Sequence, residues 1–538
     1  MLLTLVFALL TGCNTSPPKF DMPTVPLPNR FREAGGVAPQ TPAVPAPGSW
    51  AGARNPSGGS VEKARNGWWR DFESPELNSL FDRALANNPD MRVAVHRIVQ
   101  AKARLDQARA ARLPSVSAPL VVADQSAGSG TVGAAPTGSA SSSSGASQQT
   151  WQAGVRADWR LDLWGEQSAL AESAEYQLRR AVYERENVER QLAAALAGAY
   201  VDYLSLNDRR GIAIRTDSVQ GETLATIENR VEAGDATMAD LEQQRATIYS
   251  VRATLPVLEQ QRMEALSNIA YLVGTVPGNL RLSDRGLDSL AIPATTTGVP
   301  SELLLRRPDV RMAEAELRAA NADVDVARSR LLPPVDLMAQ LGRSGATPAQ
   351  LLQPQTLFWG LVNSLTVSIF DGGRKKLDEV YSRSVREEMV EAYIRSVHQA
   401  VKEVEGALTT LRLSKQRLGA QNDTLEASRR AWEIADRVYR IGGVDYQTLL
   451  DTQRTYHRYT DDYAQARAGY MRAYVSLLQS LGGELAPDDG KPAKAGTPAA
   501  KLVRTSAGPP TEAAARCQES ASKSESPRAS ITAPCSRR

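Results

Sequence analysis

The feature of this sequence that most constrains its fold is a set of matching landmarks in two parts of the chain. The segment NPDMR at 88–92 is echoed by RPDVR at 307–311, and each opens a helical stretch that ends before a proline. Pro89 and Pro114 are 25 positions apart, as are Pro308 and Pro333. Recurrence of landmarks at equal spacing is the signature of repeated structural units. The chain therefore reads as two copies of one arrangement.

Each copy contains a pair of segments with the period of a β-strand. Residues 151–163, WQAGVRADWRLDL, place an apolar side chain at every second position. Successive side chains of a strand point to opposite faces, so this segment has one apolar and one polar face. The other predicted strands are residues 115–125, 335–343 and about 358–370. Such strands suit a soluble sheet packed on a core or a membrane barrel facing lipid.

A very long helix is predicted after each strand pair. Residues 165–230 and 374–440 contain no proline and are dominated by helix-favouring side chains. Such lengths exceed ordinary globular helices and indicate a coiled coil or a helical tube. Gly234 and Gly442 follow as the expected hairpin turns, and Thr237 and Asp445 as the caps of the returning helices.

The charged face of 151–163 favours the membrane barrel. No apolar run reaches the roughly 18–20 residues of a transmembrane helix, so a span requires a closed barrel. Four strands cannot close one, because the smallest membrane barrels use about eight. Several chains must then share the barrel, with its polar face lining a water-filled lumen. The residues predicted to face this lumen are Arg156, Asp158, Arg160 and Asp162.

The two ends of the chain have a different composition from its centre. Residues 1–12 resemble a signal peptide, and LTGC at 10–13 resembles the lipobox that leads to a lipidated Cys13. Residues 13–60 are then a lipidated extended segment, and 487–538, which hold Cys517 and Cys535, a disordered tail. Between them we expect repeats at 61–300 and 301–486.

Catalysis, cofactor binding and nucleic-acid binding receive no support from the sequence. The net charge of +3 is small, and basic residues alternate with acidic ones. No nucleophile elbow, phosphate-binding loop or zinc motif occurs. The three histidines, at 96, 398 and 457, are far apart in helical patterns. We therefore expect no enzyme activity, no cofactor and no metal site.

The order of these parts resembles the outer-membrane efflux proteins, the TolC-like channels, and in particular their NodT or OprM-like lipoprotein branch. The resemblance covers residues 13 to about 486. The segments that carry it, besides Cys13, are WWRDFESPELNSLFDRALANNPD (68–90), DLWG (162–165), RRPDV (306–310), SIFDGGR (368–374) and YRIGGVDYQTLLDTQR (439–454).

The resemblance implies a homotrimer in the cell outer membrane. It also implies a twelve-stranded barrel with four strands per chain, and a long α-helical tunnel in the periplasm. The implied partners are sister subunits, outer-membrane lipid, a periplasmic adaptor, and an inner-membrane pump of the resistance-nodulation-division type. The implied function is passive, gated export of drugs or other small molecules.

The resemblance also implies a gate at the periplasmic tip. Matching the turn glycines places Asp240 and Tyr439 at a polar link that closes the tip. Asp451 matches an acid that forms a ring around the lumen, whereas Thr448 stands where some relatives carry a second acid. In a plain reading, Asp451 is a solvated helix residue and Tyr439 a packing residue.

Two other functions remain open at this point. The same architecture serves type I protein secretion, although many such channels lack the lipid. A periplasmic coiled-coil adaptor would also carry long helical hairpins, but it would lack two pairs of amphipathic strands.

Overall fold

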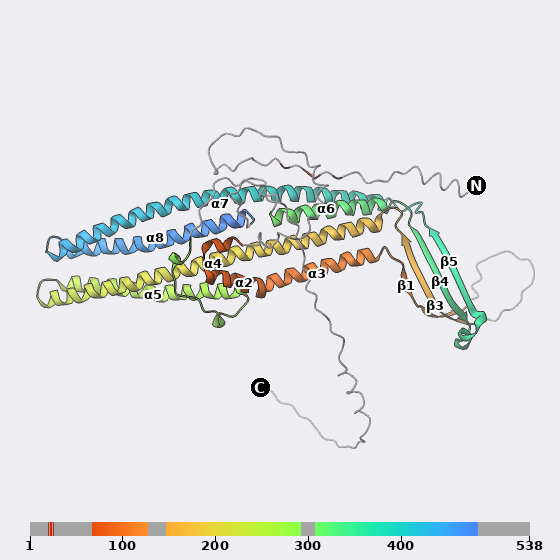
Figure 1. Cartoon of the computed structure of the whole chain (residues 1–538), viewed down its shortest axis with the longest axis horizontal. Helices are drawn as coiled ribbons and strands as arrows, with labels where there is room; N and C mark the ends of the chain where they lie inside the picture. The colour runs from red at the N-terminus through yellow and green to blue at the C-terminus, as the bar shows by residue number, and fades with distance from the viewer. Residues whose placement is uncertain are drawn as a thin grey trace, which may run out of the picture.

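The computed structural model describes residues 20, 22–23, 25, 67–126, 147–291 and 307–482. The molecule is elongated, with the strands at one end and the turns of two helical hairpins at the other (Figure 1). Short helices surround the middle of the long ones. The predicted signal peptide, the predicted lipidation site Cys13 and the predicted disordered tail lie outside the described residues.

Two series of elements follow one another in the same order. The first contains α3 (Pro89–Ala110), β1 (Ser115–Ser117), β2 (Leu120–Ser126), β3 (Ser147–Leu161), α4 (Glu166–Glu232) and α5 (Met238–Val273). The second contains α6 (Pro308–Ser329), β4 (Val335–Gly345), β5 (Leu357–Leu365), α7 (Arg374–Arg440) and α8 (Tyr446–Ser480). The remaining short helices are η3 (Trp68–Phe72), α2 (Pro75–Asn87), η4 (Pro277–Asn279), η5 (Leu287–Ser289), η7 (Pro348–Leu352) and η8 (Pro354–Thr356).

The two long helices predicted from the proline-free runs are confirmed. Helices α4 and α7 each contain 67 residues, which corresponds to about 100 Å at 1.5 Å per residue. Each packs against its returning helix, α4 on α5 and α7 on α8. None of the described helices is both long and apolar enough to cross a membrane.

The strands form one antiparallel sheet in the order β1-β3-β4-β5, and β2 also pairs with β3. The centre of the sheet is the pairing of β3 with β4, which runs from Trp151 opposite Gly345 to Leu161 opposite Val335. The outer strands each have one neighbour among the described strands, so both edges of the sheet lack a partner within the described part of the chain.

The predicted boundary of the last strand was wrong. β5 ends at Leu365 rather than near residue 370, because its partner β4 begins at Val335, which pairs with Leu365. Two prolines precede Val335, and a proline has no N–H with which to extend the ladder. Residues 366–370 therefore leave the sheet before α7.

Two other predicted strand boundaries also need correction. The strand expected at 115–125 is interrupted at Ala118-Pro119 and divides into β1 and β2. Proline again explains the break, since Pro119 cannot donate to β3, although its carbonyl accepts from the Gly154 N–H at 3.2 Å. β3 spans 147–161 instead of 151–163, because the chain beyond Leu161 turns to start α4.

Two adjacent glycines allow the central strands to approach closely. Gly154 lies opposite Gly342 in the β3–β4 pairing. A Cβ atom on Gly154 would lie 2.5 Å from the carbonyl oxygen of Leu341, and one on Gly342 would lie 2.7 Å from that of Ala153. Glycine pairs of this kind mark places where a sheet bends or coils sharply.

The main hydrophobic core lies around the middle of the long helices. Trp68 and Phe81 are buried there at 5% and 1% exposure, and Trp69 stacks on Phe81 with ring centroids 4.3 Å apart. Buried side chains of α4, α5, α7 and α8 complete this core.

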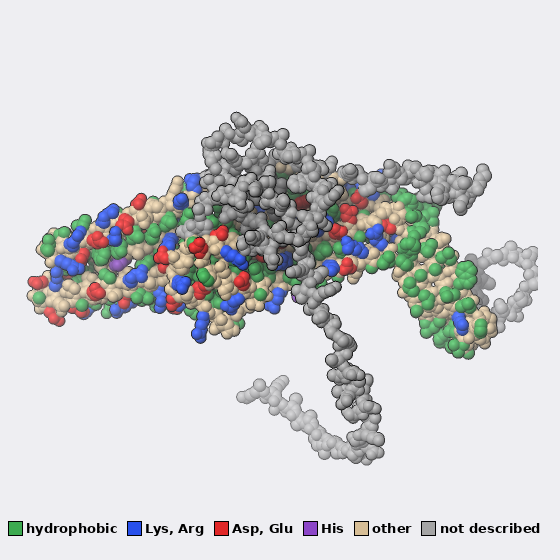
Figure 2. All heavy atoms as spheres, viewed as in Figure 1, with side chains coloured by type: hydrophobic (Ala, Val, Ile, Leu, Met, Phe, Trp, Pro, Cys, Tyr) green, Lys and Arg blue, Asp and Glu red, His purple; other side chains and the backbone are tan. Residues whose placement is uncertain are grey.

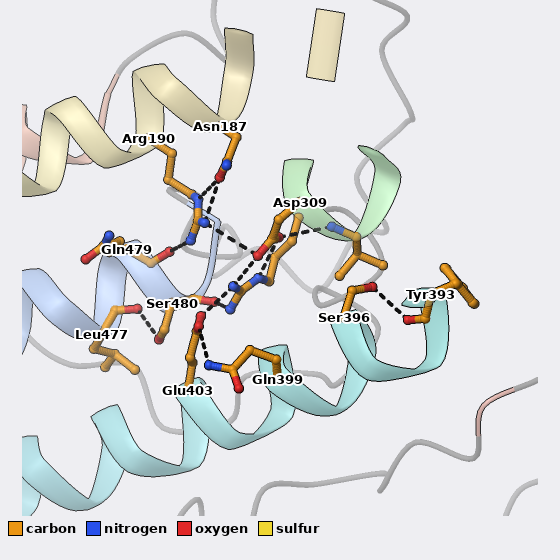
Figure 3. A network of polar contacts seen from close by, with 12 residues as sticks. Asn187, Arg190, Asp309, Tyr393, Ser396, Gln399, Glu403, Leu477, Gln479 and Ser480 are labelled. Atoms are coloured by element: carbon orange, nitrogen blue, oxygen red, sulfur yellow. Dashed lines mark hydrogen bonds and ion pairs between the residues drawn. The ribbon is translucent and has the colours of Figure 1, made fainter. Parts of the chain in front are cut away.

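A buried ionic network joins four helices beside the core (Figure 3). Arg307, whose side chain is fully buried, binds the carboxylates of Asp309 and Glu403 and the backbone carbonyl of Ser480. Arg190 on α4 lies 3.5 Å from Asp309 and donates to the Gln479 carbonyl. Two cations and two anions thus balance one another where α6 begins and α8 ends.

Candidate functional site

One face of the sheet is mostly polar, and the apolar side chains on it are Val121, Ala123, Met338, Phe358 and Val362. Cross-strand partners share a face, so Arg156 lies beside Gln340 and Arg160 beside Asp336. Arg156 donates from Nε and from Nη2 to the two oxygens of the Asp158 carboxylate, each at 2.8 Å. Arg160 Nε donates to Asp336 Oδ1 at 2.8 Å. The polar residues that share this face are Ser115, Ser117, Gln152, Arg156, Asp158, Arg160, Asp336, Gln340, Ser344 and Ser364.

Asp162 has a different place from the other three charged residues. It lies beyond the end of β3, and its carboxylate accepts hydrogen bonds from the backbone N–H groups of Gln167 and Ser168, each at 2.9 Å. Acceptors at a helix N-terminus satisfy donors that lack an intrahelical partner. Asp162 therefore fixes the junction between the sheet and α4.

The opposite face of the sheet is mostly apolar and exposed, with Asn363 in its centre and Arg343 near one end among its polar exceptions. It carries Trp159 and Val155 on β3 and Trp359 and Leu361 on β5, of which Trp359 is 79% exposed. Green side chains gather over the strand end, whereas charges of both signs mix over the helices (Figure 2). A continuous exposed apolar surface of this kind marks contact with a membrane or another protein.

The opposite end of the molecule consists of two tight helical turns. Gly234 and Gly442 lie in them with left-handed φ values of +81° and +75°. In each turn the N–H of the residue after the glycine donates to a carbonyl of the preceding helix, from Asp235 to Arg230 at 2.8 Å and from Gly443 to Val438 at 2.9 Å. This C-terminal motif requires a residue in the left-handed region, which glycine adopts without steric cost.

Both predicted caps of the returning helices are confirmed. Thr237 accepts from the Asp240 N–H at 3.2 Å, while the Asp240 carboxylate accepts from the Thr237 N–H at 3.1 Å, which is a capping box. Asp445 accepts from the Thr448 N–H at 2.9 Å and so caps α8.

The predicted gate residues each make a different contact within the described part of the chain. Asp240 takes part in the capping box, and in the described structure no hydrogen bond joins it to Tyr439. The Tyr439 ring instead contacts Arg230, whose guanidinium carbon lies 4.6 Å from the ring centroid. Asp451 is exposed and accepts from Gln447 Nε2 at 3.1 Å.

A small second core at the tip was not predicted from the sequence. Ile227 on α4, Leu241 on α5, and Tyr446 and Leu450 on α8 are buried together, with Tyr439 packed against them. The Tyr446 hydroxyl donates to Gln244 Oε1 at 2.5 Å. The spacing of Tyr446, Leu449 and Leu450 indicates a buried helix face. The partner of Tyr446, Gln244, is 202 positions away and could not be identified from that spacing.

A seam of polar contacts connects the two hairpins between this tip and the main core. Asp202 pairs with Arg472, Arg209 with Asp461, and Thr216 with His457, at 2.8, 2.7 and 3.2 Å. The α4 members recur every seven residues, the heptad spacing of a coiled coil. Burial lowers the pKa of His457 to about 4, so this histidine is neutral at neutral pH.

The described residues contain no group of His, Cys, Asp and Glu side chains arranged to hold a metal ion. The arrangement instead combines an amphipathic sheet at one end, long paired helices, and two tight helical turns at the other end.

A protein family and several known proteins resemble this chain in sequence. The family described as outer membrane efflux protein matches residues 80–275 and 299–483. The pyoverdine export outer membrane protein OpmQ of Pseudomonas aeruginosa is 35% identical over 417 residues, which are 77% of this chain and 87% of that protein. The probable efflux pump outer membrane protein TtgC of Pseudomonas putida is 28% identical over 450 residues, 82% and 91% of the two chains.

Solved structures agree with this comparison. The outer-membrane channel OprN has a TM-score of 0.72 and 29% identity, covering 78% of this chain and 92% of its own. The open state of the Neisseria gonorrhoeae MtrE outer membrane channel has a TM-score of 0.72 and 24% identity, covering 87% and 97%. The similarity to MtrE is one of fold alone.

Proposed function

Because this chain belongs to the outer membrane efflux protein family, we propose that it is the outer-membrane duct of an efflux system and exports small molecules passively. The observation that carries this proposal is the sheet of β1 to β5, which has one largely polar, charged face, one exposed and mostly apolar face, and two edges without a partner among the described residues. An unpaired edge in hydrocarbon costs several kcal/mol per backbone group, so the sheet needs further strands to enter a bilayer.

Three copies of the chain complete the barrel in this proposal. Each contributes four strands, with β1 and β2 counted as one. The barrel of twelve continues into a tunnel built from α3, α4, α6 and α7 beside the strands and from α4, α5, α7 and α8 toward the hairpin turns (Figure 1). The matched order and lengths of the two series of elements support the proposed internal repeat. In the proposed layout the repeats occupy residues 61–300 and 301–486.

The polar sheet face lines the lumen, and the ion pairs keep its charge balanced. Arg156, Asp158 and Arg160 are the proposed lumen residues, while Asp162 is left out because it caps α4. The mostly apolar face, which carries Trp159 and Trp359, contacts lipid. An arginine turned toward lipid at the midplane would cost about 2–4 kcal/mol, which fixes the register of the strands.

The helical tip is the resting seal. Three copies of Asp451 around the axis would repel one another and attract cations, which makes the ring a filter for charge. Asp240 and Tyr439 are proposed to take part in closing the tip. Their separate contacts within one chain support roles at the junctions between helices or subunits rather than a bond to each other.

The partners and cargo follow from the family. We propose that a periplasmic adaptor and an inner-membrane pump of the resistance-nodulation-division type work with this duct, and that a lipid on Cys13 adds a second membrane anchor. The name of the relative OpmQ points to pyoverdine export. A secreted small molecule of that kind is the proposed class of cargo here.

Planar-bilayer recording of the purified full-length protein tests this function. The expected result is a heat-modifiable trimer from outer-membrane fractions that produces discrete conductance steps. A water-soluble monomer that produces no conductance would overturn the proposal.

A further inference from the structure

The tip of each subunit contains a buried hydrogen-bond chain across three helices. Tyr446, the first residue of α8, donates to Gln244 Oε1 on α5 at 2.5 Å. Gln244 Nε2 in turn donates to the carbonyl and side-chain oxygens of Gln220 on α4, at 2.8 and 2.7 Å. The chain therefore connects the α4/α5 hairpin with the α7/α8 hairpin.

The side-chain amides of Gln244 and Gln220 in this hydrogen-bond chain are buried, although they lie near the tip of the molecule. Gln244 is 0% exposed, Gln220 1% and Tyr446 7%. Apolar side chains of Ile227, Leu241 and Leu450 surround them. A hydrogen bond in such surroundings is stronger than in water, and separating its partners leaves each one unsatisfied until water enters.

Two buried polar atoms in the adjoining part of the seam destabilise the packed arrangement of the hairpins. Gln453 Oε1 and His457 Nε2 are both buried without a hydrogen-bond partner among the described residues. Buried unsatisfied polar atoms are costly, and parting the hairpins would hydrate both of them. Three polar contacts hold the packed seam in this region: the Tyr446 chain, the bond from Arg454 Nη2 to Thr247 Oγ1 at 2.6 Å, and the contact of Thr216 Oγ1 with His457 Nδ1 at 3.2 Å.

We propose that Tyr446 and Gln244 form a latch within each subunit, and that their hydrogen bond breaks when the two hairpins separate to open the tip. This latch presupposes the tip gate proposed above and assigns its control to two side chains inside one subunit. Its position favours that role, because Tyr446 stands directly after the Gly442 turn and fixes the start of α8 against α5.

Single-channel recording of Tyr446→Phe tests the latch. The variant keeps the buried ring and removes only the donor. We expect the ratio of open to closed channel to rise about fivefold per subunit, which corresponds to about 1 kcal/mol. Gln244→Leu should open the channel similarly, and the double variant should add little to either single change.

Tyr474→Phe is the matched control. Tyr474 is a buried tyrosine on the same helix, 1% exposed, and its hydroxyl has no partner in the described structure. Its removal should leave gating unchanged.

A labelling experiment reports the separation of the hairpins directly. Gln453→Cys, in a background with Cys517 and Cys535 replaced by serine, places a thiol in the buried seam. Maleimide should modify it several-fold faster in the Tyr446→Phe trimer than in the parent trimer. Equal gating and equal labelling in folded trimers of both would refute the latch while leaving the duct intact. A parent protein that forms no pore would instead refute the duct.

Discussion

Asn88 and Arg307 hold matching positions in the two series of elements and make the same kind of contact. Each directly precedes the proline that opens a 22-residue helix, α3 or α6. Asn88 Nδ2 donates to the Leu272 carbonyl near the end of α5 at 2.9 Å, and Arg307 Nη1 donates to the Ser480 carbonyl at the end of α8 at 2.8 Å. Both residues thus tie a returning helix to the start of the helix that leads to the strands.

Replacement of Arg307 should destabilise the subunit strongly. Arg307→Met leaves Asp309 and Glu403 without their buried partner, and breaking a buried ion pair from one side costs about 3–5 kcal/mol. We expect the lower end of that range, because the Glu403 side chain is 38% exposed. Thermal unfolding of the purified trimer measures the loss.

Arg318→Met is the control for that change. Arg318 is 40% exposed and pairs with Glu314 one turn away, so its removal should change the free energy of unfolding by less than about 0.5 kcal/mol. Equal effects of the two substitutions would contradict the assignment of the network as a structural joint.

Acidification should weaken the seam between the hairpins. Burial lowers the pKa of His457 from 6.5 to about 4, so its contribution is fully present above pH 6.5 and is lost as the pH falls toward 4. The groups that face it are the Thr216 hydroxyl and the Tyr456 ring, and the Arg209–Asp461 pair lies one helical turn away.

The size of this pH effect follows from the shift. At pH 5 the loss should be about 2 kcal/mol per subunit relative to pH 7.5. The thermal midpoint of the trimer, recorded at both pH values, measures it. His457→Gln should remove most of the difference; an unchanged pH dependence in that variant would show that other groups cause it.

The two glycines at the centre of the sheet should resist substitution. Gly342→Ala places a methyl group 2.7 Å from the Ala153 carbonyl oxygen, so the strands must move apart. We expect a cost of about 1–3 kcal/mol and less assembled trimer in the outer membrane. Gly360→Ala should be tolerated, because its Cβ would meet the flexible Gln340 side chain at 3.3 Å.

Much of this architecture could be predicted from the sequence because it depends on local patterns. The absence of proline and the abundance of alanine, leucine, glutamate and arginine predict α4 and α7 to within a few residues. Thr237 and Asp445 were identifiable as caps because capping acts over three residues. The alternation in 151–163 likewise identifies both faces of β3.

The errors concern features that depend on pairing between distant segments. The end of β5 depends on where β4 begins, and Asp162 leaves the sheet because α4 needs acceptors at its N-terminus. Tyr446 and Gln244 lie on different hairpins, and no local period relates them. A family match for Asp240 and Tyr439 likewise does not specify which side chains they contact.

The two sheet faces should respond oppositely to a new charge. Leu361→Arg puts a cation on the apolar face of β5 and should cost about 2–4 kcal/mol in a bilayer. The yield of heat-modifiable trimer in outer-membrane fractions should fall accordingly. Ser364→Arg places the same charge on the polar face of the same strand, opposite Asp336, where trimer yield should be unchanged. Equal yields would mean that the apolar face does not meet lipid.

Cysteine cross-linking between the two edges of the sheet tests most directly whether sister copies complete it. In a background without Cys517 and Cys535, one cysteine is placed on the first edge, at Val116, Leu120 or Val122, and one on β5, at Leu357, Leu361 or Leu365. These positions share the apolar face. Oxidation of outer membranes should give a covalent trimer for at least one pair, which reductant returns to monomer. Monomer alone for every pair would contradict a barrel built from three chains.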